Sequence, residues 1–170
     1  MTSVGIVVGN PKPKSRTLSA AQSVADVAAA AAGLGDADRF VVDLADLGGD
    51  LFDWASARVR EAVEQVSAAD LIVVASPTYK ATYTGLLKSF LDWFSTTGLS
   101  GVTTVPVMVG AGPTHALAVE VHLRPVLIEI GATLPTRGLY VLEQQLEDLR
   151  PALEAWLVEA AAPLRAAVRR

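Results

Sequence analysis

Three short segments of the chain are apolar almost throughout and rich in β-branched residues, and they constrain the fold more than any other feature. They cover residues 3–9, 71–75 and 103–109, and each is bounded by Gly, Pro, Ser or Asn. A strand with one face in water alternates apolar and polar residues, whereas a strand covered by helices on both faces does not. The segments therefore predict buried strands of a parallel sheet.

Two weaker strands and five helical stretches complete the pattern. The strands are predicted at 39–44 and 138–142, and the helices at 17–32, 55–67, 83–94, 115–130 and 144–168. Such alternation is typical of a doubly wound α/β sheet with right-handed crossovers. It predicts one domain over residues 1–170 with strand order 2-1-3-4-5 and a ligand site between strands 1 and 3. Pro106 falls within the fourth strand although it has no N–H to donate to a sheet.

Composition excludes several classes of protein. The chain is 51% hydrophobic, contains no cysteine and carries a formal net charge of −4. Without cysteine there is no disulfide framework or zinc–thiolate cluster, which fits a cytoplasmic protein. The negative charge disfavours nucleic acid as a partner. No apolar stretch reaches the ~20 residues of a membrane span, and no basic segment precedes the first strand, so membrane insertion and secretion are not expected.

The loop after the first predicted strand is suited to bind a phosphate. It spans residues 9–17 and leads into the first helix, whose N–H groups and dipole favour an anion by about 0.3–1 kcal/mol. Hydroxyl, amide and cationic side chains gather there, namely Asn10, Lys12, Lys14, Ser15, Arg16 and Thr17. The alternative is that Ser15 or Thr17 only caps the helix and that the cations are solvated.

Two common nucleotide motifs are missing from this loop. It has neither the G-x-G-x-x-G of a dinucleotide fold nor the G-x-x-x-x-G-K-[ST] of an NTPase. Asp43 ends strand 2, where a dinucleotide fold places its ribose-binding acid. Without those glycines we interpret Asp43 as an ordinary strand-end residue.

Two further loops leave strands 3 and 4 at the same edge of the sheet. Rigid, aromatic and polar residues in the first of them suit a planar ring, namely Pro77, Thr78, Tyr79, Lys80 and Tyr83. Small residues in the second allow close approach of a ligand to the backbone, and its candidates are Gly110, Ala111, Gly112 and His115. Each loop alone also fits a surface turn, and a lone histidine is more often structural than a ligand contact.

Together, the three loops resemble those of the NAD(P)H-dependent FMN reductases of the flavodoxin-like fold, especially the alkanesulfonate-monooxygenase type. Residues 9–17 are similar to that family's G-S-P-R-x-x-S-x-[ST] phosphate loop, with Asn10 for Ser and Lys12 for Arg. Residues 76–92 are similar to its [ST]-P-x-Y-x-x-x-x-x-G-x-L-K-x-x-L-D segment, which wraps the isoalloxazine ring. Residues 106–127 are similar to the segment that follows, proline included. The resemblance implies a flavodoxin-like three-layer α/β sandwich with a five-stranded parallel sheet.

The resemblance also implies an enzyme that uses FMN and NAD(P)H. The chemistry is hydride transfer from nicotinamide C4 to flavin N5, for which the protein positions the two rings. The implied partners are these small molecules and a separate monooxygenase that receives reduced FMN. Lys12, Lys14, Arg16 or Lys80 is a candidate contact for the 2′-phosphate of NADPH. Members of this type carry a Tyr near the position of Val121, where this chain has an aliphatic residue. The helix that contains this position is expected at the subunit interface.

Aromatic residues on the predicted helix 83–94 favour a homodimer or homotetramer. Phe90, Trp93 and Phe94 add to an apolar stripe that three leucines already fill, so some of these rings are expected to face a partner. The alternative is that they pack locally under neighbouring loops.

Other functions remain open to the same fold. An FMN-bound quinone or azo reductase would keep its flavin through turnover, and a flavodoxin-type electron carrier would lack a nicotinamide site. Such carriers are usually more acidic than −4, and their phosphate loop is rich in Thr, Ser and Gly. A response-regulator receiver is disfavoured, because it needs paired acids where Gly9 and Asn10 stand.

Overall fold

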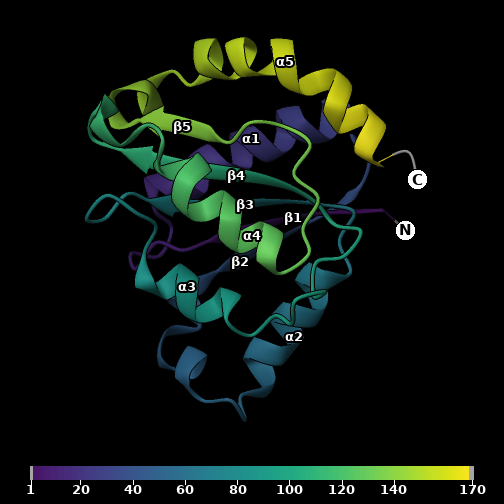
Figure 1. Cartoon of the computed structure of the whole chain (residues 1–170), viewed down its shortest axis with the longest axis vertical. Coiled ribbons are helices and arrows are strands. Elements are labelled where there is room, and N and C mark those ends of the chain that lie inside the picture. Colours follow the sequence, from purple (N-terminus) through teal and green to yellow (C-terminus); the bar gives the residue numbers. More distant parts are fainter. Residues whose placement is uncertain (1, 169–170) are drawn as a thin grey trace.

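The computed structural model describes residues 2–168 and contains a parallel sheet of five strands (Figure 1). The strands are β1 (Ser3–Val8), β2 (Asp38–Asp43), β3 (Leu71–Pro77), β4 (Thr103–Gly110) and β5 (Leu139–Leu142). Their order is β2-β1-β3-β4-β5, and all neighbouring pairs run parallel. The flavodoxin-like fold class and the strand order predicted from the sequence are confirmed.

Helices cover both faces of the sheet. One face carries α1 (Arg16–Ala32) and α5 (Arg150–Val168), and the other carries α2 (Ala57–Ser67), α3 (Gly85–Leu91) and α4 (Arg124–Glu129). Figure 1 shows this three-layer arrangement, with α5 beside α1. No helix in the described part of the chain is long and apolar enough to cross a membrane.

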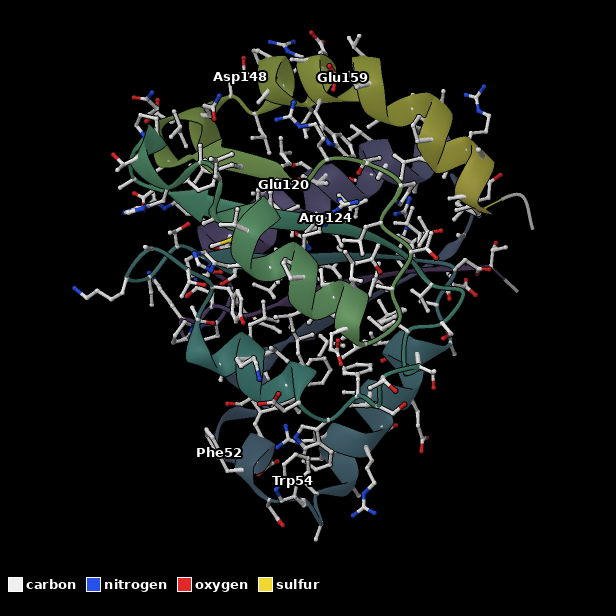
Figure 2. The ribbon with its side chains drawn as sticks, viewed as in Figure 1. Phe52, Trp54, Glu120, Arg124, Asp148 and Glu159 are labelled. Carbon is white, nitrogen blue, oxygen red and sulfur yellow. The ribbon has the colours of Figure 1, made fainter. Side chains whose placement is uncertain are left out.

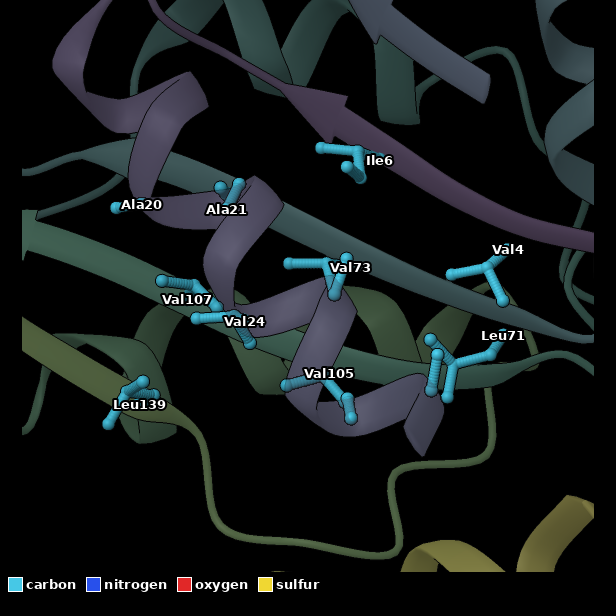
Figure 3. Packing of buried hydrophobic residues seen from close by; sticks show 14 of the residues in the cluster. Val4, Ile6, Ala20, Ala21, Val24, Leu71, Val73, Val105, Val107 and Leu139 are labelled. Carbon is cyan, nitrogen blue, oxygen red and sulfur yellow. The ribbon is translucent and has the colours of Figure 1, made fainter. Parts of the chain in front are cut away.

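Strand side chains alternate between the two helical layers. From β3, Leu71 and Val73 face the layer of α1 and α5 (Figure 3), while Ile72 and Val74 face the other layer. All four are at most 1% exposed. Burial on both faces explains why this strand is an unbroken apolar run.

The inner face of α1 consists almost entirely of alanine. The helix begins after Ser15, whose Oγ accepts a hydrogen bond from the Leu18 N–H at 3.3 Å. Its buried residues beyond the first turn are Ala20, Ala21, Val24, Ala25, Ala28, Ala29 and Ala32. Figure 3 shows the first three of them next to the strand side chains. Small side chains let the helix lie close to the sheet, which brings its amino end near the end of β1.

Pro106 lies inside β4 without breaking the sheet. The Thr103 N–H donates towards β3, to Asp70 O, and the Thr104 N–H donates the other way, to Thr133 O. By this alternation the nitrogen of Pro106 faces the β5 side. Pairing with β5 begins only at Val107, so Pro106 occupies a position where no N–H is needed.

The predicted helix 115–130 is broken into three pieces. They are a 3₁₀ turn at Pro113–His115, a π-helical turn at Val119–Leu123, and α4. Pro125 has no N–H for a hydrogen bond to the preceding turn, so the regular helix restarts around it, with the proline in the first turn. Similarly, the predicted helix 144–168 starts only at Arg150, where Pro151 occupies the first turn.

Glu120 and Arg124 fix this region to the segment before β5 (Figure 2). Glu120 Oε1 accepts from the Gly138 N–H at 2.5 Å. The Arg124 guanidinium donates to the carbonyls of Thr136 and Leu134 at 2.7 and 2.8 Å. These bonds satisfy backbone groups that an irregular segment would otherwise leave unpaired.

The aromatic residues of α3 and its following turn are covered by the chain itself. Phe90 is fully buried, Phe94 is 8% exposed, and the Trp93 indole N–H donates to Leu51 O at 3.0 Å. The alternative of local packing is therefore correct: Phe90 and Phe94 belong to the core, and the segment between β2 and α2 contacts Trp93 through Leu51 and Trp54. Instead Phe52 and Trp54 of that segment are exposed, at the lower end of Figure 2.

We predict that Gly9→Ala lowers the free energy of unfolding by about 1–3 kcal/mol, because overpacking forces backbone shifts. A Cβ at Gly9 would lie 2.4 Å from Leu87 Cβ and 3.1 Å from Leu87 Cα. Urea denaturation followed by circular dichroism measures the change. Gly35→Ala is the control, since nothing lies within 4 Å of its added Cβ. Equal stability of the two variants would contradict the close approach.

Candidate functional site

A cavity of 210 Å³ opens at the carboxyl edge of the sheet, where the strand order reverses between β1 and β3. Its lining residues are Asn10, Lys12, Ser15, Arg16, Thr17, Pro77, Tyr79, Val109, Glu143 and Leu146. The first seven are candidates from the sequence. The structure thus brings the loop after β1 and the loop after β3 together around one space.

Asn10 organises the loop after β1. Its side-chain oxygen accepts from the Lys12 N–H at 2.9 Å, and its Nδ2 donates to Thr17 Oγ1 at 3.1 Å. Asn10 and Thr17 are both buried. Because Thr17 Oγ1 acts as the acceptor of this bond, its own hydrogen remains to be donated to a ligand.

The start of α1 presents unused backbone donors to the cavity. Within residues 2–168, no hydrogen bond uses the N–H of Ser15, Arg16 or Thr17. Helix starts leave such groups without an internal partner. Ser15 does cap the helix, as the structural alternative predicted, but its hydroxyl hydrogen is still free to be donated. Capping and anion binding are therefore compatible here.

Charged side chains divide into those that reach the cavity and those that do not. Lys12 and Arg16 line it. Lys14 does not line it. The backbone N–H of Lys14 donates to Asp43 Oδ2 at 3.1 Å, and Asp43 Oδ1 accepts from the Ala45 N–H. The interpretation of Asp43 as a structural strand-end residue agrees with these bonds. On α3, the hydrogen bond to Asp92 raises the pKa of Lys88, but that exposed pair lies outside the cavity.

The loop after β3 forms a tight turn that holds Tyr79 at the cavity. The Tyr79 N–H donates to Thr82 O at 2.8 Å, and the Thr82 N–H donates back to Tyr79 O. Between them Lys80 and Ala81 have positive φ angles of 51° and 70°. Two-residue turns of this kind require positive φ at both central positions, which residues other than Gly seldom adopt.

Buried hydroxyl groups join this loop to the end of β1. Thr84 Oγ1 donates to Gly9 O at 2.5 Å and accepts from the Leu87 N–H at 3.1 Å. The Thr84 N–H donates to Ser76 Oγ at 3.0 Å. Thr84 thus caps α3 and also holds the two site loops at a fixed distance from each other.

Tyr140 supports the loop after β4. Its hydroxyl donates to Gly112 O at 2.9 Å. A Cβ at Gly110 would lie 1.8 Å from this hydroxyl oxygen, so only glycine leaves room for it. Thr78 Oγ1 lies on the same side and is buried with no hydrogen-bond partner in residues 2–168. An unsatisfied buried hydroxyl is often the partner of a missing ligand or water.

The remaining sequence candidates lie at the same edge but do not line the cavity. They are Thr78, Lys80, Tyr83, Gly110, Ala111, Gly112 and His115. Lys80 and His115 are exposed, and Tyr83 packs partly against the core under α3. Sequence reasoning missed Val109, Tyr140, Glu143 and Leu146. Glu143 directly follows the predicted strand 138–142, so the rule that ligands bind at carboxyl ends of strands would have indicated it.

The donor set fits FMN. The backbone donors of α1, the hydroxyls of Ser15 and Thr17 and two cations match a phosphate ester. Tyr79 lines the cavity beside these donors and offers a flat surface for a planar ring system, and the preceding residue, Thr78, has a buried hydroxyl without a partner in residues 2–168. These residues have the chemistry to bind and orient a phosphate-bearing aromatic ligand.

Comparison with known proteins supports this view. Residues 2–147 match the model of the family described as NADPH-dependent FMN reductase. The chain is 38% identical over 85 residues to an FMN reductase (NADPH) of Escherichia coli, which is 50% of this chain and 44% of that protein. It is 31% identical over 138 residues to an FMN reductase (NADPH) of Pseudomonas aeruginosa, which is 78% of this chain and 69% of that protein.

A solved structure extends the likeness to the whole fold. An apo NADH:FMN oxidoreductase superposes with a TM-score of 0.75 at 31% identity, over 99% of this chain and 87% of that one. The chain spans about half the length of most of the curated relatives that it matches. The family match covers the sheet and all three site loops, and the chain belongs to the NADPH-dependent FMN reductase family.

Proposed function

We propose that the protein is an NAD(P)H:FMN oxidoreductase that reduces FMN for use by another protein. The observation that carries this proposal is the cavity in which free N–H groups of α1, two hydroxyls and two cations converge next to Tyr79. Family membership supports the same reaction. Relatives named for NADPH and for NADH both occur, so the proposal includes either nicotinamide.

Each site loop has a separate role in this proposal. Asn10, Ser15 and Thr17 hold the phosphate, together with Lys12 and Arg16. The turn at Pro77–Tyr83 and the segment Gly110–His115 position the ring system. FMN held there would supply the redox chemistry of hydride transfer from reduced nicotinamide. The protein contributes binding, orientation and exclusion of water, and orientation alone can supply several kcal/mol of barrier reduction.

The exposed lysines suit the second, larger substrate. Lys14 and Lys80 are exposed and do not line the cavity, but each belongs to a loop that does. The positive charge of these lysines would attract a 2′-phosphate bound near them, which would favour NADPH over NADH.

The proposal also includes the partner of the protein, its oligomeric state and its location in the cell. We propose that a flavin-dependent monooxygenase receives the reduced FMN in the cytoplasm. A homodimer or homotetramer is supported by three large apolar residues that are more than half exposed near the π-helical turn and α4, namely Leu117, Val121 and Ile128. Static light scattering determines the assembly, and a monomer mass would contradict it.

The direct test of function is steady-state oxidation of NADPH and NADH with and without added FMN. Oxidation well above the free-flavin background is expected, and its absence for both nicotinamides would overturn the proposal. If FMN binds but neither nicotinamide reacts, the result favours an electron carrier. Flavin that remains with the protein on gel filtration favours a quinone or azo reductase.

Thr17→Val is expected to weaken FMN binding by about 10- to 100-fold, because one hydrogen bond to a charged group contributes about 1.5–3 kcal/mol. Valine keeps the shape of threonine but removes the hydroxyl that Asn10 orients. Fluorescence titration gives the dissociation constant. Riboflavin, which has no phosphate, should bind both proteins equally. Ser19→Ala, at an exposed position two residues further along α1 that does not line the cavity, is the control variant. Equal losses for FMN and riboflavin would contradict a phosphate role for Thr17.

Tyr140→Phe is expected to loosen the loop after β4 while leaving the phosphate loop intact. The change removes the hydrogen bond to Gly112 O, which contributes about 1 kcal/mol. We expect faster amide exchange at Ala111, Gly112 and Thr114 and a several-fold lower kcat/KM for NAD(P)H, measured with FMN saturating. Unchanged exchange in that segment would show that Tyr140 does not position it.

A further inference from the structure

A carboxylate shares the cavity with the groups that suit a phosphate. Glu143 begins the 3₁₀ turn Glu143–Glu147 that follows β5, and it lines the cavity beside Lys12 and Arg16. Its Oε2 lies 3.1 Å from Arg16 Nη2, although the residues are 127 positions apart in the chain. An acid has the wrong charge for this place, so its presence requires an explanation.

The ion pair is not needed to hold the turn in position. The side chains of Arg16 and Glu143 are 71% and 48% exposed, and exposed pairs of this kind contribute little to stability. β5 already pairs with β4 along its whole length. The Leu142 N–H also donates to Gln145 Oε1 at 2.8 Å, which fixes the start of the turn. Stability therefore gives no reason for an acid at position 143.

Glu143 opposes phosphate binding in two ways. It occupies a guanidinium N–H group of Arg16 that a phosphate oxygen would otherwise accept from. It also repels a phosphate, which carries between one and two negative charges near neutral pH. Neither effect acts on a flavin that has no phosphate.

We propose that Glu143 limits the affinity of the site for FMN, so that the flavin exchanges with solution instead of remaining permanently bound. This inference rests on the proposed function and adds a specificity-determining residue to the same site. Of the three charged side chains that line the cavity, Lys12 and Arg16 attract the phosphate and Glu143 offsets part of that attraction. The site then selects a phosphate-bearing flavin through its many donors but releases it readily.

The test compares FMN and riboflavin binding by the full chain and its Glu143→Gln variant. Glutamine keeps the size of the side chain and a hydrogen-bond acceptor for Arg16 but removes the charge. We expect FMN to bind about three- to fivefold more tightly, as for loss of one like-charge contact at this partly exposed site. Stopped-flow release of FMN should slow by a similar factor. Riboflavin affinity should stay within about twofold, because its only difference is the missing phosphate.

Glu147→Gln is the matched control, since Glu147 ends the same turn and does not line the cavity. It removes the same charge at a place where solvent and salt screen it. FMN affinity that is unchanged or weaker in Glu143→Gln would overturn the inference. So would equal tightening in Glu147→Gln, or equal tightening for riboflavin. If FMN binds to none of the three proteins, the proposed function fails as well, which separates that outcome from the others.

Discussion

The hydrogen bond from Thr84 to the carbonyl of Gly9 connects the two loops on which the site depends. The donor and acceptor are 75 residues apart and buried, and the bond is 2.5 Å long. The same Thr84 oxygen caps α3 by accepting from the Leu87 N–H, and the backbone N–H of Thr84 donates to Ser76 Oγ. One side chain therefore sets the position of α3, the loop after β1 and the loop after β3. Because Gly9 has no Cβ, Leu87 can approach it closely enough for this bond to form.

Burial of the strands explains why the chemistry gathers at one edge. Strands such as β3 and β4 are covered on both faces, so their side chains hold the core and offer no polar surface. Within β3 and β4, polar residues therefore occur only near the ends of the strands. This is why the fold and the loops after β1 and β3 could be predicted from the sequence. The apolar run of β1 is followed by Asn10, and that of β3 by Pro77 and Tyr79, so each run indicates a strand and the site loop after it.

Features that depend on contacts between distant segments were not predictable in the same way. Tyr140 reaches a carbonyl 28 residues away, and Glu143 meets Arg16 across the cavity. No local pattern encodes such distances. The local packing of the aromatic residues in and just after α3 was not predictable for the same reason, because the segment that contacts Trp93 belongs to another part of the chain. Pro125 lies inside an otherwise helical sequence pattern, and the regular helix restarts around it.

The two loops that meet at Thr84 differ in how they are held, and the difference suits their proposed roles. The phosphate loop contains Pro11 and Pro13 and is closed by the side chain of Asn10, so its donors are in place before a ligand arrives. The turn after β3 keeps two residues, Lys80 and Ala81, in a left-handed conformation, and the phosphate loop keeps one, Lys14; this conformation costs roughly 1 kcal/mol or more for each residue. Such strain persists only when surrounding contacts enforce it. Here the paired backbone of Tyr79 and Thr82 and the anchor at Thr84 enforce it, and the result is a tyrosine held at the cavity with its ring half exposed.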